Sequence, residues 1–183
     1  LRADQRNKQA QLEREKIFAA LYPKEKYNNG RLNLVVHLLL TQIKDFLALQ
    51  EFEEERNMKE LYQCRALRKL SAVKSYEKSF DKLKKKHQDH PYRNVGYHYL
   101  NYQLHQEEYI YTASQRRAGR MNLEELVKEL TVFYLADILR HSCSILTAQR
   151  IGKEAYQMEL LEEVLRYVER SSVKSTPAIA IYH

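Results

Sequence analysis

Glycine and proline are scarce in this sequence, with four Gly and three Pro among 183 residues. Both residues interrupt helices, so their scarcity, together with abundant Leu, Glu, Lys, Arg, Gln and Ala, indicates long helices joined by short connections. The chain has the length of one ordinary domain or of one run of helical hairpins. We therefore expect an all-α fold without a sheet.

Cysteine is also rare. Cys64 and Cys143 lie far apart and form no CxxC motif, so the sequence indicates neither a disulfide framework nor a zinc ribbon. We expect both to be small buried residues, and we expect no cofactor. A reducing cytoplasm is the predicted location.

The sequence shows no charged-then-apolar leader, and no unbroken apolar run approaches the roughly 20 residues that a membrane span requires. We expect a soluble protein with no membrane partner. The chain starts at Leu1 and stops at a sequence typical of the opening of a helix, Pro177 to His183. This favours residues 1–183 as one all-α region of a longer helical-repeat protein, with polar residues 1–11 as a frayed or helical extension.

The segment from Leu32 to Phe52 is the most apolar part of the chain. Its apolar residues at helical spacing are Leu32, Val35, Val36, Leu39, Ile43, Phe46 and Leu47, and Leu34, Leu38, Leu40 and Leu49 widen the face most of the way round. A helix of this kind needs cover on several sides. We expect neighbouring segments to pack around it as the central helix of a bundle.

Turn and cap signals predict the other boundaries. Tyr22-Pro23 ends a first helix, Asn28 caps the central helix, Pro91 takes the first position of a later helix, and Gly119 ends that helix. Helical spacing predicts further helices over about 58–70, from Ser71 or Ser75 to His87, 92–118, 123–149 and 156–170, and the start of another at Pro177. We expect about seven helices plus a truncated last one, stacked as antiparallel hairpins in an irregular bundle or short array.

Two resemblances follow from these helix boundaries and the segments around them. The helix pair from Met58 to Pro91, followed by a proline-initiated helix, resembles one unit of a tetratricopeptide (TPR)-like array, and Thr176-Pro177 repeats the pattern. The segments at residues 21–23, 46–48, 91–93, 133–136 and 177–180 together are similar to an uncharacterised bacterial family of helical proteins. That resemblance implies a helical scaffold and no reaction.

Positive charge is concentrated in one third of the chain. Residues 57–120 hold fourteen Lys and Arg against six Asp and Glu, which accounts for the net charge of +7. Lys74, Lys78, Lys82 and Lys86 recur at every fourth residue and form a row on one helix. Such a row can neutralise phosphates, which makes it a candidate polyanion-binding face. The alternative is a solvated face that keeps the protein soluble.

A short pattern near residue 93 carries the sharpest catalytic signal. Arg93-Asn94-Val95-Gly96-Tyr97-His98 resembles the RNxxxH signature of HEPN ribonucleases, which are all-α and metal-independent. That resemblance implies that Arg93 holds a phosphate, Asn94 orients the group, and His98 acts as general acid or base. The alternative is an exposed Arg93 and a packed or surface His98.

The histidines and tyrosines of the same region have simpler interpretations. Of His87, His90, His98 and His105, only the first two are closely spaced, and no Cys or carboxylate accompanies them at a known ligand spacing, so we predict no metal site. The tyrosine-rich helix is expected to contribute mainly to the core. Tyr99, Tyr102 and Tyr109 are a candidate face for a protein or peptide.

The leading prediction is a helical-repeat scaffold for protein–protein interaction, with no catalytic activity and with a protein or peptide partner. Two alternatives belong to other classes. One is a basic nucleic-acid-binding helical module, and the other is a HEPN-like ribonuclease that uses Arg93 and His98. The sequence identifies neither the partner nor the oligomeric state.

Overall fold

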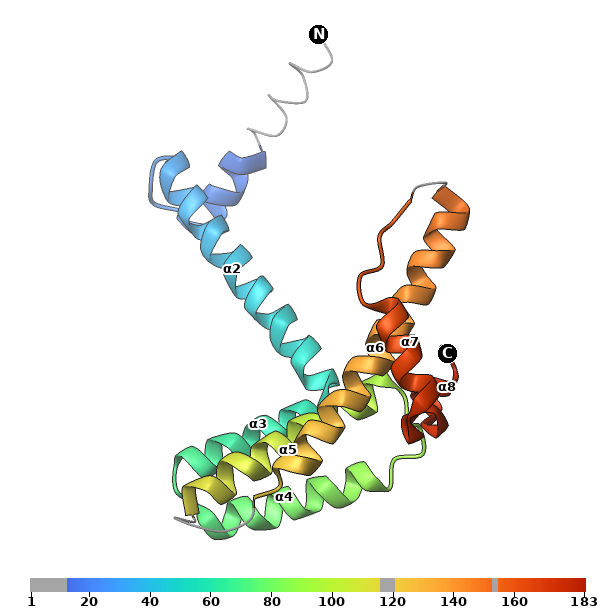
Figure 1. The fold of residues 1–183 in the computed structure, drawn as a ribbon. Coiled ribbons are helices and arrows are strands. Elements are labelled where there is room, and N and C mark those ends of the chain that lie inside the picture. Colours follow the sequence, from blue (N-terminus) through green and yellow to red (C-terminus); the bar gives the residue numbers. More distant parts are fainter. Residues whose placement is uncertain (1–12, 116–120, 153–154) are drawn as a thin grey trace. The chain divides into compact units, whose positions relative to one another are not determined.

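The computed structural model describes residues 13–115, 121–152 and 155–183, and in these ranges every regular element is a helix (Figure 1). The prediction of an all-α protein is confirmed. The chain forms two compact units, Leu1–Glu55 and Arg56–His183. Each unit is described by itself.

The first unit is a helical hairpin. Helix 13–21 ends just before Tyr22-Pro23, as predicted, and is followed by α2 (Asn29–Glu54). The side chain of Asn28 accepts a hydrogen bond from the Arg31 backbone N–H at 3.0 Å, so the predicted cap is confirmed. Helix 13–21 lies against the first turns of α2, where Arg14 Nη2 donates to Asn29 Oδ1 at 3.1 Å.

Beyond these first turns, α2 is not covered within its unit. Leu32 is its one buried residue. Within its own unit α2 therefore lacks the cover expected of a central helix, because helix 13–21 reaches only its first turns. By length and composition alone, the 26 residues of α2 are also sufficient to cross a membrane.

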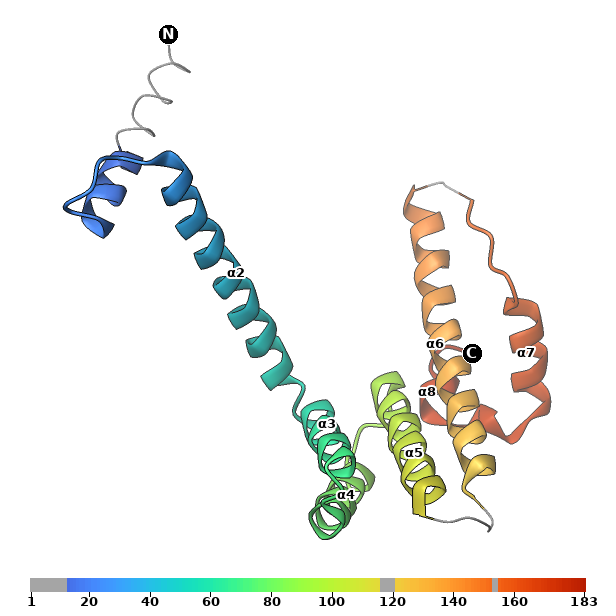
Figure 2. The ribbon, with the colours of Figure 1, turned by 90° about the vertical axis from the view of Figure 1, so that its left-hand side faces the viewer.

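The second unit contains the remaining elements. They are α3 (Arg56–Lys69), α4 (Val73–Gln88), α5 (Val95–Gln115), α6 (Leu123–Gly152), α7 (Leu161–Arg170), the 3-10 helix η1 (Ser172–Ser175) and α8 (Pro177–Ala180). A short connection joins α3 to α4 as a hairpin, α5 packs against α3 and α6, and α6 also contacts α7 and α8 (Figure 2).

Several predicted boundaries hold and others do not. Pro177 occupies the first turn of α8, as predicted. Pro91 does not begin a helix, because α5 starts only at Val95, where Asn94 Oδ1 accepts from the Tyr97 N–H at 2.9 Å. The helix expected from residue 156 starts at Leu161. Gly119 and residues 1–11 lie outside the described residues.

Two clusters of buried side chains hold the second unit together. The hairpin core consists of Leu61, Cys64, Tyr76, Phe80, Leu83, Leu100 and Leu104. The C-terminal core consists of Val95, Val132, Leu135, Ala136, Leu139, Val164, Val168, Ala178 and Ile179. α5 contributes to both, since its first residue faces one cluster and its middle turns face the other. It is the element that connects the two halves of the unit.

Candidate functional site

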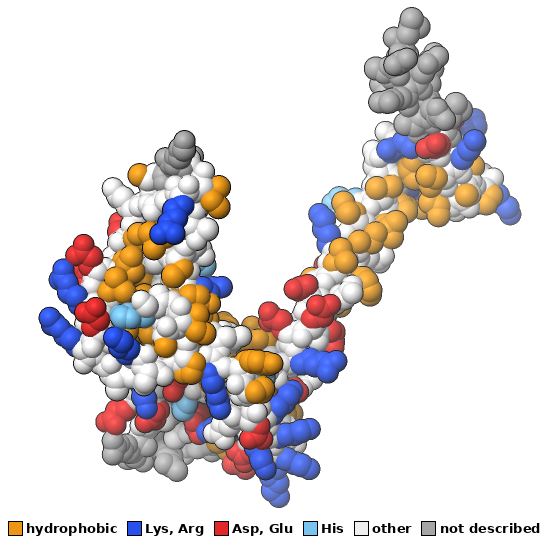
Figure 3. Space-filling model, turned by 90° about the vertical axis from the view of Figure 1, so that its right-hand side faces the viewer, with side chains coloured by type: hydrophobic (Ala, Val, Ile, Leu, Met, Phe, Trp, Pro, Cys, Tyr) orange, Lys and Arg blue, Asp and Glu red, His pale blue; other side chains and the backbone are white. Residues whose placement is uncertain are grey.

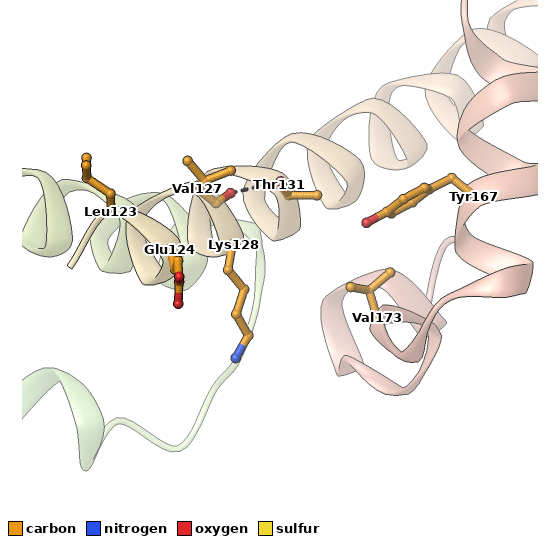
Figure 4. Close-up of a pocket in the computed structure, with 7 residues that line it drawn as sticks. All are labelled: Leu123, Glu124, Val127, Lys128, Thr131, Tyr167 and Val173. Atoms are coloured by element: carbon orange, nitrogen blue, oxygen red, sulfur yellow. Dashed lines mark hydrogen bonds between the residues drawn. The ribbon is translucent and has the colours of Figure 1, made fainter. Parts of the chain in front are cut away.

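A groove of about 570 Å³ lies between the first turns of α6 and the α7–η1 segment (Figure 4). The residues that line this α6–α7 groove are Leu123, Glu124, Val127, Lys128, Thr131, Tyr167 and Val173. Burial of Val164 and Val168 fixes α7 against α6, and this places Tyr167 at the groove. Figure 4 shows Tyr167 and Val173 extending towards α6 from the opposite side.

The groove is apolar in its centre and charged at one edge. Val127 is 58% exposed and Tyr167 is half-exposed, while Thr131 Oγ1 already donates to the Val127 carbonyl oxygen at 2.8 Å. Lys128 Nζ lies 3.8 Å from Glu125 Oε2. With no nucleophilic thiol or His among its lining residues, the groove is suited to hold apolar side chains rather than to perform chemistry.

The sequence did not predict this groove. Helical spacing predicted only a helix over 123–149, and Leu123 and Val127 on that helix are exposed. The sequence did indicate some exposed apolar surface on this helix, because α6 carries more apolar residues than one packed stripe can bury. Their position opposite Tyr167 depends on a contact between distant segments.

The three residues of the RNxxxH pattern each make a different structural contact. The Arg93 guanidinium stacks 4.2 Å from the Tyr97 ring centroid and donates to the Gln88 carbonyl oxygen at 2.7 Å. Asn94 caps α5. His98 is buried, and its Nδ1 lies 4.0 Å from Glu129 Oε2.

A cavity of about 210 Å³ lies beside this pattern but does not bring its members together. Asn57, His87, His90, Asn94, Gly96, Tyr97 and Leu100 line it. Arg93 and His98 are not among these lining residues. The residue expected to hold a phosphate and the residue expected to transfer a proton therefore do not line a common cavity.

Buried histidines nevertheless shape the electrostatics here. The His87 ring stacks on Tyr97 with centroids 4.0 Å apart, and burial lowers the His87 pKa to about 4. The interaction with His98 lowers the pKa of the half-buried Glu129 carboxyl, although burial opposes that shift. These groups form a polar seam between α4, α5 and α6, which fits a structural role.

The candidate tyrosine face is only partly open. Tyr99 is 39% exposed, but its ring lies 5.2 Å from that of Phe133 on α6. Tyr102 and Tyr109 are partly buried. All three lie on α5, and the ring contact with Phe133 places Tyr99 beside the surface where α5 packs on α6.

The lysine row is exposed along α4, as its spacing predicts, but one member is paired. Lys86 Nζ lies 2.7 Å from Glu60 Oε1, and the neighbouring Lys84 lies 2.8 Å from Glu108 Oε1. Lys74, Lys78 and Lys82 are exposed. Three cations therefore remain in the row for an external anion.

A buried carboxylate in the second unit was not predicted. Glu107 on α5 is 0% exposed and accepts from Arg68 Nε at 2.6 Å, with Arg65 Nε at 3.5 Å. Tyr76 lies in the same core, and burial raises the pKa of its hydroxyl. Arg65 and Arg68 follow one face of α3, but only the tertiary contact pairs them with Glu107.

Neither cysteine shows features of a nucleophile. Cys64 is buried in the hairpin core, as expected, and burial raises its pKa to about 11. Cys143 is half-buried, with Sγ 3.7 Å from the Tyr182 carbonyl oxygen. Within the ranges that the structure describes, no group of three or more His, Cys, Asp or Glu side chains forms a potential metal site.

No protein-family profile matches the chain, and comparison with curated proteins and with solved structures found no similar protein.

Proposed function

We propose that the chain is a helical-repeat scaffold without catalytic activity that binds a protein or peptide partner in the α6–α7 groove. The observation that carries this proposal is the groove itself, with its exposed Val127 and Tyr167. Apolar side chains in an open depression gain free energy when a partner removes them from water. An extended or helical peptide with two or three large apolar residues is the ligand that fits this chemistry.

The TPR-like part of the proposal rests on one helix pair. α3 and α4 have 14 and 16 residues and form a hairpin, whereas α5 and α6 have 21 and 30 residues. The hairpin is therefore the unit that matches a repeat in size, and the groove lies outside it, between α6 and the α7–η1 segment. A cytoplasmic location remains a prediction from the sequence.

Peptide selection tests the proposal directly. A phage-displayed random peptide library is panned on the immobilised full chain, and the selected peptides are titrated against the wild type and Val127→Glu. We expect apolar peptides whose affinity falls at least about ten-fold in Val127→Glu, because the new carboxylate would be desolvated on binding.

Leu146→Glu is the matched control. Leu146 is an exposed apolar residue on the same helix and does not line the groove. Its substitution should leave peptide affinity unchanged. If selection yields no apolar peptide, or if both variants lose binding equally, the groove is not the binding site.

The second candidate function is polyanion binding along α4, which the exposed Lys74, Lys78 and Lys82 favour. Single-stranded RNA binding measured across salt concentrations would distinguish it. If this row carries the function, affinity falls steeply with salt, and replacing the three lysines by Ala reduces the salt slope by about two to three. For the ribonuclease alternative, metal-independent RNA cleavage lost in His98→Ala would be the required result.

A further inference from the structure

α2 exposes nine large apolar side chains over most of its length, a pattern that Figure 3 shows as a continuous band. They are Leu34, Val36, Leu38, Leu39, Leu40, Ile43, Phe46, Leu47 and Leu49. Exposed single apolar residues are ordinary, but contiguous apolar surface marks an interaction site. The groove proposal does not account for this surface, because the groove belongs to the other unit.

Four of these residues form a regular seam. Val36, Leu39, Ile43 and Phe46 are separated by three, four and three positions, the spacing that aligns side chains along one line of contact between two helices. Val36 and Ile43 alternate with Leu39 and Phe46 along this α2 seam. Leu40 and Leu47 flank it, and they widen the surface that a partner would cover.

The two ends of the hairpin have opposite charge. Residues 24–31, at the start, carry a net charge of +2, and residues 51–55, at the end, carry a net charge of −4. Lys24 and Lys26 are exposed, and Arg31 pairs locally with Glu25. Figure 3 shows the acidic side chains gathered near the C-terminal end of α2. A partner helix of the same sequence would match these charges only when it runs in the opposite direction.

We propose that the α2 seam pairs with the α2 seam of a second copy of the chain in antiparallel orientation. One register satisfies the whole seam: Val36 lies opposite Phe46 of the second copy, and Leu39 lies opposite Ile43. The same register brings Arg31 level with Glu51 of the second copy. The apolar spacing and the charge distribution thus select the same arrangement, whereas a parallel pair would place like charges together.

Helix 13–21 extends the proposed interface. Its Ile17 and Leu21 are exposed, and the helix lies against the first turns of α2. In the antiparallel register this end faces the last turns of the second α2, where Leu47 and Leu49 are exposed. Two hairpins would then bury apolar residues from four helices, which suits the breadth of the α2 surface.

A lipid bilayer suits α2 less well. The uncharged stretch from Leu32 to Ile43 is about 18 Å long at 1.5 Å per residue, and Lys44 and Asp45 follow it directly. A bilayer core is about 30 Å thick. A spanning α2 would carry both charges into hydrocarbon, whereas at a protein interface they lie off the seam and can stay in water.

The mass of the full chain in solution tests the proposal. Sedimentation equilibrium is expected to give twice the chain mass of 21.9 kDa. Leu39→Glu should convert the protein to a monomer, with at least a hundred-fold weaker self-association, because it places a charge in the seam. Leu38→Glu is the matched control, since Leu38 and Leu39 are both 54% exposed but Leu38 lies off the seam. It should remain a dimer.

Orientation is tested by disulfide cross-linking. Val36→Cys and Phe46→Cys are each made in a chain with Cys143→Ser, while the buried Cys64 is retained. The mixture should form a cross-linked dimer that neither protein forms alone. Cross-linking of each protein by itself would indicate a parallel pair and would overturn the proposed arrangement.

Three further outcomes would reject the proposal. A monomeric wild type at 100 µM, or equal disruption by Leu38→Glu and Leu39→Glu, would exclude the seam. Flotation of the wild type with phosphatidylcholine–phosphatidylglycerol vesicles, lost in Leu39→Glu and Leu38→Glu alike, would assign α2 to lipid. Peptide binding in the α6–α7 groove is expected to persist in Leu39→Glu, so failure of this inference is separable from failure of the proposed function.

Discussion

The long helices α2 and α6 contrast sharply, although both are rich in Leu, Val and Ile. α6 buries Val132, Leu135, Ala136, Leu139 and Ser142 against neighbouring helices, whereas α2 buries Leu32 alone. The apolar content of a helix thus indicates that it needs a partner, but it does not show whether that partner belongs to the same folded unit. In α6 the cover comes from α5, α7 and α8. For α2 we infer that it comes from a second copy.

Truncation of one leucine in each helix should show this contrast most strongly. Leu139 is 2% exposed in the C-terminal core, and Leu139→Ala should lower the free energy of unfolding of the second unit by about 2–5 kcal/mol through lost burial and a new cavity. Leu38→Ala in α2, at a position that is 54% exposed and lies off the α2 seam, should change the free energy of unfolding of its own unit by less than about 1 kcal/mol. Urea denaturation followed by tyrosine fluorescence measures both. Equal effects would mean that the contrast between α2 and α6 is not real.

Removal of an ion pair should destabilise the second unit more than the first, because the carboxylate is buried in the second unit and exposed in the first. Glu107→Gln leaves Arg65 and Arg68 without their buried carboxylate and should cost about 2–3 kcal/mol, below the value for fully buried partners because both arginines reach water. Glu25→Gln removes the exposed Arg31 pair of the first unit and should cost less than about 1 kcal/mol. Thermal unfolding of both variants at matched ionic strength compares them. A larger loss in Glu25→Gln would contradict this ranking.

Acidification should act on the second unit through His87. Its pKa is about 4 in the folded chain and about 6.5 when unfolded, so between these values the unfolded chain binds a proton that the folded chain does not. The stabilisation is complete above pH 6.5 and is lost as the pH falls towards 4. We expect a decrease of about 1–2 kcal/mol between pH 6.5 and 5.

Two variants isolate this histidine. His87→Phe keeps an aromatic ring on Tyr97 and should flatten the dependence of unfolding free energy on pH in this window. His37→Gln, at an exposed position on α2, should leave the dependence intact. A pH profile that is unchanged in His87→Phe would assign the loss of stability between pH 6.5 and 5 to another group.

The smallest expected effects concern two equivalent helix caps. Asn28 accepts from the Arg31 N–H in the first unit, and Asn94 accepts from the Tyr97 N–H in the second. Each substitution to Ala should cost about 1 kcal/mol. Hydrogen exchange should show Asn28→Ala loosening only the first turns of α2, and Asn94→Ala only those of α5. Spread of either effect into the other unit would indicate that the units fold cooperatively.

Local signals in the sequence predicted much of the fold. Scarce Gly and Pro predicted an all-α chain, and Pro23, Asn28 and Pro177 each marked a boundary that the structure confirms. Pro91 failed as a boundary signal because proline is compatible with a loop as well as with a first helical turn, and Asn94 provides the cap instead. Such signals act over a few residues. They therefore predict where a helix begins more reliably than which other segments it packs against.

The candidate site was less accessible to sequence reasoning. The lysine row was predicted as a row because four-residue spacing alone aligns side chains on a helix. The α6–α7 groove was not predicted, because Val127 and Tyr167 come together only when α7 folds back on α6. Arg93 and His98 are close in the sequence, but they do not line a common cavity in the structure.

The sequence by itself determined that this protein is built from helices, where several of them begin, and which of their faces are apolar or basic, since these properties depend on neighbours within one or two turns. Tertiary structure decided that α6 is packed by other helices of its unit whereas most of α2 is exposed within its own unit, that Glu107 pairs with two arginines in a core, and that a groove opens beside Tyr167. These outcomes depend on which distant surfaces meet, and helical periodicity carries no information about that choice.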